Sequence, residues 1–451
     1  MLEHCTGGSH RTVSRSCDVR RRRAVAGAAA WLVAWLAPHA QAGDVTTIVT
    51  YPSSVSQDAN GPLDLKAELN YDDAQAQAPI FVVMHGFSPA TGNFDNVRPN
   101  AQRLRDSGFF AISVAMRGRD GSDGVRDSGG VEIHDIYDAV EYVKSAFAPW
   151  VDPTHVSITG YSGGGGNVMS ALVRFPDTFR VGAGFFGMSD YGHDPLESWY
   201  FKGAAASHKA ILLADVGDPL SGDPRVADRY HARASCLAAS NNRHSEIHLF
   251  VNHDELTCPP VNDFRFRDLT AGGYSPAETA VALPGTVGQV TVHVGGLGQW
   301  VDFNHNGVPD AGEWQDWPHN APTASQQQAA EGWYLDRLLS GAIPQPVLDA
   351  QGSLVVLGWV RTRPFSLWMG DGQDAVAHLR YALSAHLKRF EFEVVTLDKS
   401  LTGRLCVETA DMSGRTVLVR LNGAPHSTFV GGGTWCQDGF ADADLLELIG
   451  L

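Results

Sequence analysis

Basic residues are scarce in this sequence, and no long apolar run follows its N-terminal region. Lysine and arginine together number 34 against 50 aspartates and glutamates, which gives a formal net charge of −16. A chain this acidic does not bind nucleic acid or anionic lipid through its overall charge. No apolar stretch after residue 42 is long enough to cross a bilayer. We therefore expect neither a nucleic acid nor a membrane as a partner.

Cysteine is also rare, with six in 451 residues and no C-x-x-C arrangement. That absence argues against a zinc or dithiol redox motif. The four cysteines beyond the N-terminal region are Cys236, Cys258, Cys406 and Cys436. In an oxidising compartment we expect sequence neighbours to pair, Cys236 with Cys258 and Cys406 with Cys436, whereas four free thiols are the alternative.

The first 42 residues have the pattern of a secretory signal peptide. Four arginines at 20–23 precede the apolar run from Ala24 to Leu36, and Ala40-Gln41-Ala42 follows as a cleavage site. The apolar run is too short to span a bilayer. We expect cleavage after Ala42 and a secreted or periplasmic protein.

Two regions of different character follow. Residues 43–345 alternate apolar strand signals with amphipathic helix signals, which predicts an α/β domain with a mostly parallel sheet. Residues 346–451 contain short β segments separated by glycine-rich turns, which predicts a smaller β-rich, sandwich-like domain. The expected strands include Ile80 to Met84, Phe110 to Ala115, Val156 to Thr159, Val181 to Phe186, Ile247 to Val251 and Val290 to Val294, and the expected helices Val131 to Phe147 and Gln326 to Leu339.

The run Gly160-Tyr161-Ser162-Gly163-Gly164 is the most informative motif. It follows an apolar strand and precedes a helix-like stretch, the context of a nucleophile elbow. The turn is so tight that small residues must flank the serine, whose hydroxyl then projects toward substrate. Ser162 is therefore the expected nucleophile.

The strand ending in His85-Gly86-Phe87 completes an acyl-transfer site. Such a site needs backbone N–H groups directed at the oxyanion. The expected donors are the amides of Phe87 and Gly163, and His85 is expected to be structural.

Several stretches resemble the α/β-hydrolase superfamily, and within it the prolyl oligopeptidase (S9) branch with its dienelactone-hydrolase-like and esterase relatives. They are VVMHGF, GVEIHDIYDAVEYV, VDPTHVSITGYSGGGGNVMSALVRFPDTF and LFVNHDELTCPPVNDFRF, within residues 79–340. The resemblance implies a serine hydrolase without an organic cofactor. In those peptidases a β-propeller usually precedes the hydrolase domain, whereas about 35 residues separate Ala42 from the first predicted strand here. That departure favours a carboxylic esterase with small or polymeric ester substrates. A peptidase of the same branch is the alternative, and a catalytically dead hydrolase that binds a ligand is the alternative of another class.

The catalytic acid and base admit two assignments. In the first, Ile211 to Ala214 is the acid-bearing strand, Asp218 or Asp223 is the acid and His253 the base. In the second, Ile247 to Val251 is that strand, Asp254 is the acid and His319 the base. The second fits the family's D-x-x-[VT]-P pattern with one extra residue, and a gapless match would put Glu255 in the acid role. We expect Ser162, Asp254 and His319 to form the triad.

A calcium-loop motif lies just before His319. Residues 302–313 match D-x-[DN]-x-[DN]-G-x5-E at every position. Hard Ca²⁺ prefers six to eight oxygen ligands. The expected ligands are the side chains of Asp302, Asn304, Asn306 and Glu313, the carbonyl of Val308, and Asp310 either directly or through a water molecule. The loop resembles the solitary calcium loops of dockerin-like modules, and we expect the ion to fix the segment that carries the base.

Aromatic residues are expected around the site, where they suit apolar acyl groups: Phe87, Trp199, Tyr200, Phe201, Trp300, Trp314 and Trp317. The run Arg117-Gly118-Arg119-Asp120 is expected to be a loop ordered by charge pairs. Substrate identity and oligomeric state do not follow from the sequence.

Overall fold

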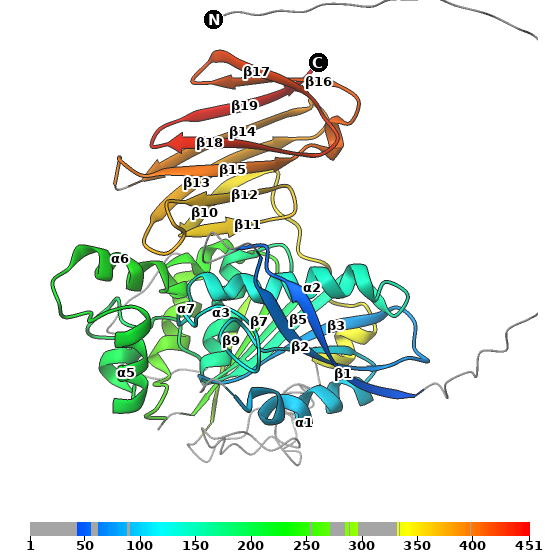
Figure 1. Ribbon diagram of the computed structural model, residues 1–451, viewed down its shortest axis with the longest axis vertical. Helices are drawn as coiled ribbons and strands as arrows, with labels where there is room; N and C mark the ends of the chain where they lie inside the picture. Colours follow the sequence, from blue (N-terminus) through cyan, green and yellow to red (C-terminus); the bar gives the residue numbers. More distant parts are fainter. Residues whose placement is uncertain are drawn as a thin grey trace, which may run out of the picture. The chain divides into compact units, whose positions relative to one another are not determined.

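Two separate β-sheets organise the chain, one mostly parallel and one antiparallel (Figure 1). The computed structural model describes residues 43–55, 62–87, 91–252, 255–270, 285–287, 289–295, 332, 334–396 and 398–451. Residues 42–451 belong to one compact unit. The predicted signal peptide lies outside the described residues. Among the helices that the structure describes, none is long and apolar enough to cross a membrane.

The first sheet has the strand order β1-β2-β4-β3-β5-β6-β7-β9-β8. Its centre, from β4 to β9, is parallel, and the pairings at its edges, β1 with β2, β2 with β4 and β8 with β9, are antiparallel. This confirms the predicted α/β class. The strands are β1 Asp44–Pro52, β2 Asp64–Asp72, β3 Ala78–Met84, β4 Phe110–Val114, β5 Val151–Tyr161, β6 Val181–Phe185, β7 Glu246–Asn252, β8 Gly285–Val287 and β9 Val290–Gly295.

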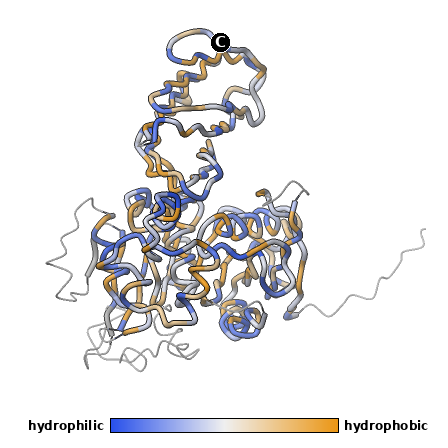
Figure 2. Tube along the Cα trace, turned by 60° about the vertical axis from the view of Figure 1, so that its left-hand side comes forward, coloured by the Kyte–Doolittle hydropathy of each residue, from blue (hydrophilic) through white to orange (hydrophobic). Residues whose placement is uncertain are grey.

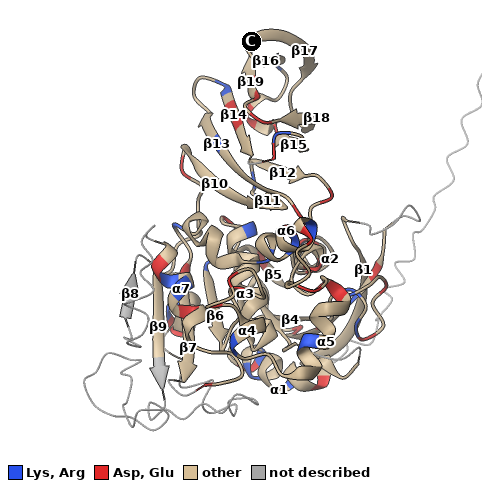
Figure 3. Ribbon diagram, turned by 90° about the vertical axis from the view of Figure 1, so that its left-hand side faces the viewer, with Lys and Arg blue, Asp and Glu red and all other residues tan. Residues whose placement is uncertain are grey.

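The central strands are apolar throughout because the sheet is covered on both faces. In β3, Ile80, Val82 and Met84 belong to one hydrophobic core, and Phe81 and Val83 belong to another. Successive side chains of a strand point to opposite faces, so these two cores lie on opposite sides of the sheet. We call them the first and second core. In Figure 3 the charged residues lie mainly on helices and loops, away from β4 and β6.

Helices from different parts of the chain cover each face. Buried residues of α2 and α3 enter the first core, and those of α1, α4 and the helical residues 334–339 enter the second. The helices are α1 Asn93–Asp106, α2 His134–Ala146, α3 Gly163–Arg174, α4 Trp199–Lys202, α5 Ala206–Asp215, α6 Pro224–Ala232 and α7 Val261–Thr270, with short 3₁₀ helices η1 Val131–Ile133, η2 Ser235–Asn241 and η3 Ala410–Met412.

The second sheet is antiparallel throughout, with the order β17-β16-β19-β14-β13-β10-β11-β12-β15-β18. Its two outermost strands, β17 and β18, are consecutive in the chain and meet where they are connected. There the rings of Phe429 and Trp435 stack 5.5 Å apart. The predicted sandwich is thus one continuous sheet that curls around its own core. Its strands are β10 Gln351–Leu357, β11 Trp359–Arg361, β12 Phe365–Met369, β13 Val376–Ser384, β14 Arg389–Thr396, β15 Thr402–Glu408, β16 Thr416–Leu421, β17 Ala424–Val430, β18 Thr434–Ala441 and β19 Leu445–Gly450.

Strands β10 and β11 also pack against the first sheet's helices. Asn241 exchanges two 2.8 Å hydrogen bonds with the backbone of Val355, from its amide nitrogen to the carbonyl and from the backbone N–H to its amide oxygen. The Trp359 ring lies 3.7 Å, between centroids, from the imidazole of His134. Trp359 is therefore part of the first core. The domain boundary at residues 345/346 stays a prediction.

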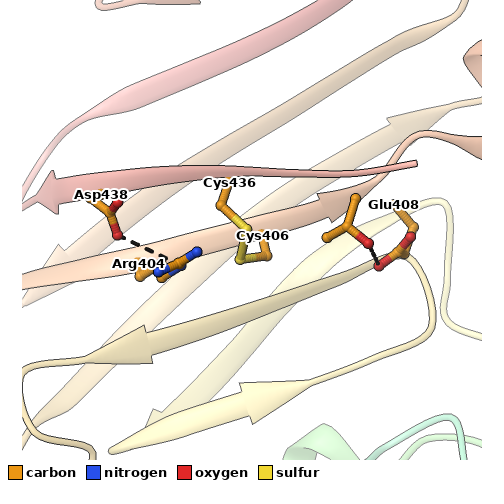
Figure 4. The surroundings of a disulfide bond; sticks show 6 residues. Arg404, Cys406, Glu408, Cys436 and Asp438 are labelled. Atoms are coloured by element: carbon orange, nitrogen blue, oxygen red, sulfur yellow. Dashed lines mark hydrogen bonds and ion pairs between the residues drawn. A yellow bond between two sulfur atoms is a disulfide. The ribbon is translucent and has the colours of Figure 1, made fainter. Parts of the chain in front are cut away.

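One of the two predicted disulfides is wrong. Cys406 and Cys436 are bonded across β15 and β18, between the Arg404–Asp438 ion pair and the Thr434–Glu408 hydrogen bond (Figure 4). Cys236 and Cys258 are instead free and buried. Cys236 belongs to the first core and Cys258 to the second, so the two thiols lie on opposite faces of the first sheet.

Candidate active site

Ser162 occupies a strained turn between β5 and α3. Its backbone has φ 55° and ψ −123°, and the left-handed half of φ space is unfavourable for residues with a Cβ. Two hydrogen bonds hold it there, from its N–H to the Phe185 carbonyl (2.8 Å) and from the Gly166 N–H to its own carbonyl (3.1 Å). The side chain is only half-buried. This is the geometry that the nucleophile-elbow motif predicts.

The glycines of the motif are required by close backbone contacts. A Cβ on Gly160 would lie 2.6 Å from the Gly164 carbonyl oxygen, and one on Gly164 would lie 2.5 Å from that of Met84. The elbow therefore packs directly on the end of β3.

The predicted oxyanion donors lie together. A Cβ on Gly163 would overlap the backbone nitrogen of Phe87, so the loop after β3 touches the first residue of α3. The N–H of a residue at a helix N-terminus has no partner inside its helix. His85 nearby is buried, and its ring nitrogens face the carbonyls of Gly86 (2.8 Å) and Ala115 (3.1 Å), which fits the structural role expected for it.

The structure decides between the two strands proposed to carry the acid. Ile247 to Val251 lies in β7, beside β6 in the sheet. Ile211 to Ala214 lies inside helix α5 and is no strand, so the first assignment is wrong in this respect. Its two acids form local turns: Asp218 accepts the Leu220 N–H (2.9 Å), and Asp223 caps α6 through the Arg225 N–H (2.9 Å). The apolar run of α5 resembles a strand in sequence because it is short.

Several predicted residues fall outside the described parts of the chain. These are His253 and Asp254, His319, the calcium ligands in 302–313 and the aromatic residues Trp300, Trp314 and Trp317. Within the described residues no group of three or more His, Cys, Asp or Glu side chains could hold a metal ion.

Glu255, the other candidate acid, is described. Its Oε1 accepts the N–H of Thr257 (2.6 Å) and that of Cys258 (3.2 Å). This carboxylate oxygen therefore stabilises the turn that follows β7.

Aromatic side chains surround Phe87 as predicted. The Phe87 ring packs edge-to-face on Trp199 (5.1 Å) and on the imidazole of His208 (5.6 Å). Tyr200 and Phe201 belong to or pack against the same second core. Helices α4 and α5 thus bring an aromatic wall to the oxyanion side of the elbow.

Two buried titratable groups in and after the turn that follows β7 were not predicted from the sequence. Cys258 is fully buried, and burial raises the pKa of its thiol well above 9.0. Asp263 at the start of α7 is fully buried, and burial followed by the charge of Glu255 raises the pKa of its carboxyl well above 3.8. A cysteine three residues before a short helix, and an aspartate inside that helix, carry no sequence signal of such deep burial.

The loop after β4 is ordered by buried ion pairs, as its sequence predicts. Arg117 binds Asp135 (2.6 Å) and Arg119 binds Glu132 (2.8 Å), with all four side chains at most 4% exposed. Burial alone would raise the pKa of Glu132, but Arg119 and backbone N–H groups lower it to about 2. These pairs stabilise the turn in front of α2.

Residues 95–209 match the profile described as "Prolyl oligopeptidase family". The matched segment runs from α1 to α5 and contains Ser162 and its elbow. This segment is therefore similar to part of the α/β-hydrolase domain of that family.

Solved structures similar to this hydrolase domain are distant. A puromycin hydrolase has 19% identity and a TM-score of 0.40, over 51% of this chain and 34% of its own. The acylaminoacyl peptidase of Pyrococcus horikoshii has 15% identity and a TM-score of 0.45, over 68% and 43%. An esterase of Pyrococcus furiosus has 12% identity and a TM-score of 0.37, over 56% and 83%. The chain therefore covers less than half the length of the puromycin hydrolase and less than half that of the acylaminoacyl peptidase. No curated protein is similar to it at a significant level.

Proposed function

We propose that this protein is a hydrolase of peptide or other amide bonds, with Ser162 as its nucleophile. The observation that carries the proposal is Ser162 at φ 55°, on an elbow in contact with the Phe87 amide and inside the segment that matches a peptidase family. The same match favours a peptidase, which was the alternative expectation from the sequence, over a carboxylic esterase.

In the proposed mechanism Ser162 Oγ attacks the substrate carbonyl and His319 accepts its proton. The Phe87 and Gly163 amides stabilise the oxyanion. His319 returns the proton to the departing amine, and water then hydrolyses the acyl-enzyme. Asp254 orients His319. We prefer Asp254 to Glu255 because Glu255 Oε1 already accepts two backbone N–H groups.

Carboxylic esters are the second candidate substrates. The aromatic wall formed by Phe87, Trp199 and His208 favours an apolar acyl group, whichever bond joins it to the leaving group. The ester and the amide share the carbonyl that Ser162 would attack, so only the leaving group separates the two substrate classes.

A direct comparison of substrates tests the proposal. Aminoacyl 4-nitroanilides and 4-nitrophenyl acyl esters are assayed side by side, together with labelling by a fluorophosphonate. We expect anilide turnover and labelling in the wild type and a loss of about 10³-fold or more in Ser162→Ala. Ser170→Ala, which removes a buried hydroxyl from the same helix, is the control that keeps activity.

The other outcomes decide between the alternatives. Ester turnover without anilide turnover would reject the peptidase reading and support an esterase. A folded protein that is not labelled would reject hydrolysis through Ser162 and support a binding protein built on a hydrolase fold.

Calcium and an extracytoplasmic location belong to the same proposal. The oxygen donors of Asp302, Asn304, Asn306, Val308, Asp310 and Glu313 suit Ca²⁺, which would fix the segment that carries His319. EDTA should lower both Tm and activity, and Ca²⁺ should restore them. Unchanged Tm and activity in EDTA would reject the site. The Cys406–Cys436 disulfide supports the secreted or periplasmic location.

A further inference from the structure

Helix α1 follows closely after the proposed oxyanion donor Phe87, and its first turn is capped by a side chain from another part of the chain. The N-cap residue, Gly92 at φ 90°, has no side chain that could accept a hydrogen bond. The first N–H groups of a helix have no partner within the helix. The carboxylate of Asp120, in the loop after β4, accepts three of them, from Gly92 (2.7 Å), Asn93 (3.1 Å) and Phe94 (3.3 Å). Its negative charge also suits the positive end of the helix dipole.

The loop that carries Asp120 is held by an ion pair and by a backbone hydrogen bond. The neighbouring Arg119 is buried and binds Glu132 at 2.8 Å. The Gly118 N–H donates to the Asp123 carbonyl (2.9 Å) and closes the loop. Asp120 itself has φ 47°, a left-handed conformation that few residues with a side chain adopt. Residues held in such conformations persist only where the surrounding structure fixes them, and they cluster at functional sites.

Phe87 is fixed at the other end of the same connection. A Cβ on Gly163 would lie 2.3 Å from its backbone nitrogen, and its ring packs on Trp199 at 5.1 Å between centroids. Only four residues separate Phe87 from Gly92. Release of the Gly92 end would therefore increase the number of conformations that are open to the Phe87 amide.

We propose that Asp120 is a positioning residue, which fixes the start of α1 and through it the Phe87 amide that stabilises the oxyanion. An oxyanion donor acts only when it is directed at the position where charge develops. A displacement of about 1 Å can lower a rate by about 10²-fold. The inference rests on the proposed function, since it assigns a role in the reactivity of Ser162.

Substitutions at Asp120 separate hydrogen bonding from charge. Asp120→Ala removes every acceptor from the start of α1, whereas Asp120→Asn keeps an acceptor oxygen and removes the charge. The readouts are the fluorophosphonate labelling rate, kcat and KM on the better substrate, and Tm. Asp442→Ala is the matched control, because the half-buried Asp442 carboxylate also accepts a backbone N–H from a distant segment, that of Thr396 (2.8 Å), but in the second sheet.

We expect Asp120→Ala to label about 5- to 20-fold more slowly, a smaller loss than the roughly 10²- to 10³-fold that follows removal of an oxyanion donor. The loss should appear in kcat with little change in KM, because the donor acts on the transition state. Asp120→Asn should recover most of the rate, because asparagine caps a helix about as well as aspartate. Asp442→Ala should label at the wild-type rate although its Tm falls as that of Asp120→Ala does, by about 1–3 °C.

A carboxylate that only stabilised the fold would slow labelling no more than Asp442 does. Labelling of Asp120→Ala at the wild-type rate would overturn the proposal, as would equal slowing in Asp442→Ala or an Asp120→Asn variant as slow as Asp120→Ala. If Asp120→Ala does not fold, Asp120→Gly replaces it, because glycine adopts a positive φ without strain, and a wild-type rate for Asp120→Gly also overturns the proposal. Absence of labelling in the wild type would instead reject the proposed function, and the positioning role with it.

Discussion

The two sheets bury their residues in different ways. The central strands of the first sheet are buried on both faces: every residue of β4 and β6 is buried. In the second sheet, strands such as β13 and β14 alternate buried with exposed or half-buried residues. Figure 2 shows polar and apolar residues interleaved along the part of the chain that ends at the labelled C-terminus.

This difference fixes where chemistry can occur. A parallel sheet covered by helices on both faces leaves the carboxyl ends of its strands as the place where loops converge. Ser162 follows β5, Phe87 follows β3 and Glu255 follows β7. The antiparallel sheet has its own core, and among its described residues we find no comparable set of strand-end side chains. The first sheet therefore depends on close backbone contacts, and the second on a curled sheet and a disulfide.

The largest effect on the active site should come from crowding the elbow. Gly160→Ala would place a Cβ 2.6 Å from the Gly164 carbonyl oxygen and 2.8 Å from the Met84 Cβ. We expect the free energy of unfolding to fall by about 1–3 kcal/mol, as for overpacked cores, with slower fluorophosphonate labelling. Denaturant unfolding measures the loss.

A glycine of the second sheet is the control for this crowding. A Cβ on Gly433, between β17 and β18, would meet no atom within 4 Å, so Gly433→Ala should change stability by less than about 0.5 kcal/mol. Equal effects of the two substitutions would contradict the contrast between the sheets.

Removal of the disulfide should destabilise the second sheet alone. Cys406 and Cys436 are 30 residues apart in sequence, for which loop closure gives about 3–4 kcal/mol. The double variant Cys406→Ser, Cys436→Ser should unfold at a lower denaturant concentration while the labelling of Ser162 in native buffer stays unchanged. Cys236→Ser, which touches no disulfide, is the comparison. Loss of labelling in the folded double variant would show that the second sheet supports the active site.

The smallest effect should be a pH dependence of stability at Asp263. Burial raises the pKa of this carboxyl well above 3.8. Between the two pKa values the folded state keeps a proton that the unfolded state releases, so stability falls as pH rises through that interval. Asp263→Asn does not titrate, and its Tm relative to wild type should therefore rise from pH 4 to pH 8. Calorimetry at three pH values measures this difference.

At Asp398, an exposed acid before β15, the pH dependence of stability should have the opposite sign. Hydrogen bonds from Ser400 lower the pKa of Asp398, so its small contribution is present above its unfolded pKa and lost as pH falls through the folded one. Asp398→Asn should therefore not gain stability at pH 8. If the Tm difference between Asp263→Asn and wild type did not change with pH, the Asp263 carboxyl would not be held protonated in the folded state.

Patterns of short range could be read correctly from the sequence. The strand, glycine-flanked serine and helix around Ser162 are local, and the structure has them where the motif predicts. The apolar run of β7 likewise matched a strand. The run at 211–214 did not, because four apolar residues fit a short amphipathic helix equally well, and packing of Leu212 into the second core decided for α5.

Contacts between distant segments could not be read in this way. The pairing of Cys236 with Cys258 followed from their nearness in sequence, but β7 runs between them and carries them to opposite faces of the sheet. The position of the turn that carries Cys258 is equally non-local, because the indole N–H of Trp199 in α4 donates to the Thr257 carbonyl.

The sequence by itself determined the class of the first sheet and the elbow at Ser162, because periodicity and glycine spacing act over short distances. Only the tertiary structure decided which side chains face Ser162 and on which side of the sheet each cysteine lies. The physical reason is that successive residues of a strand alternate between faces, so a shift of one residue exchanges the two cores. No local pattern fixes which loop then reaches the nucleophile.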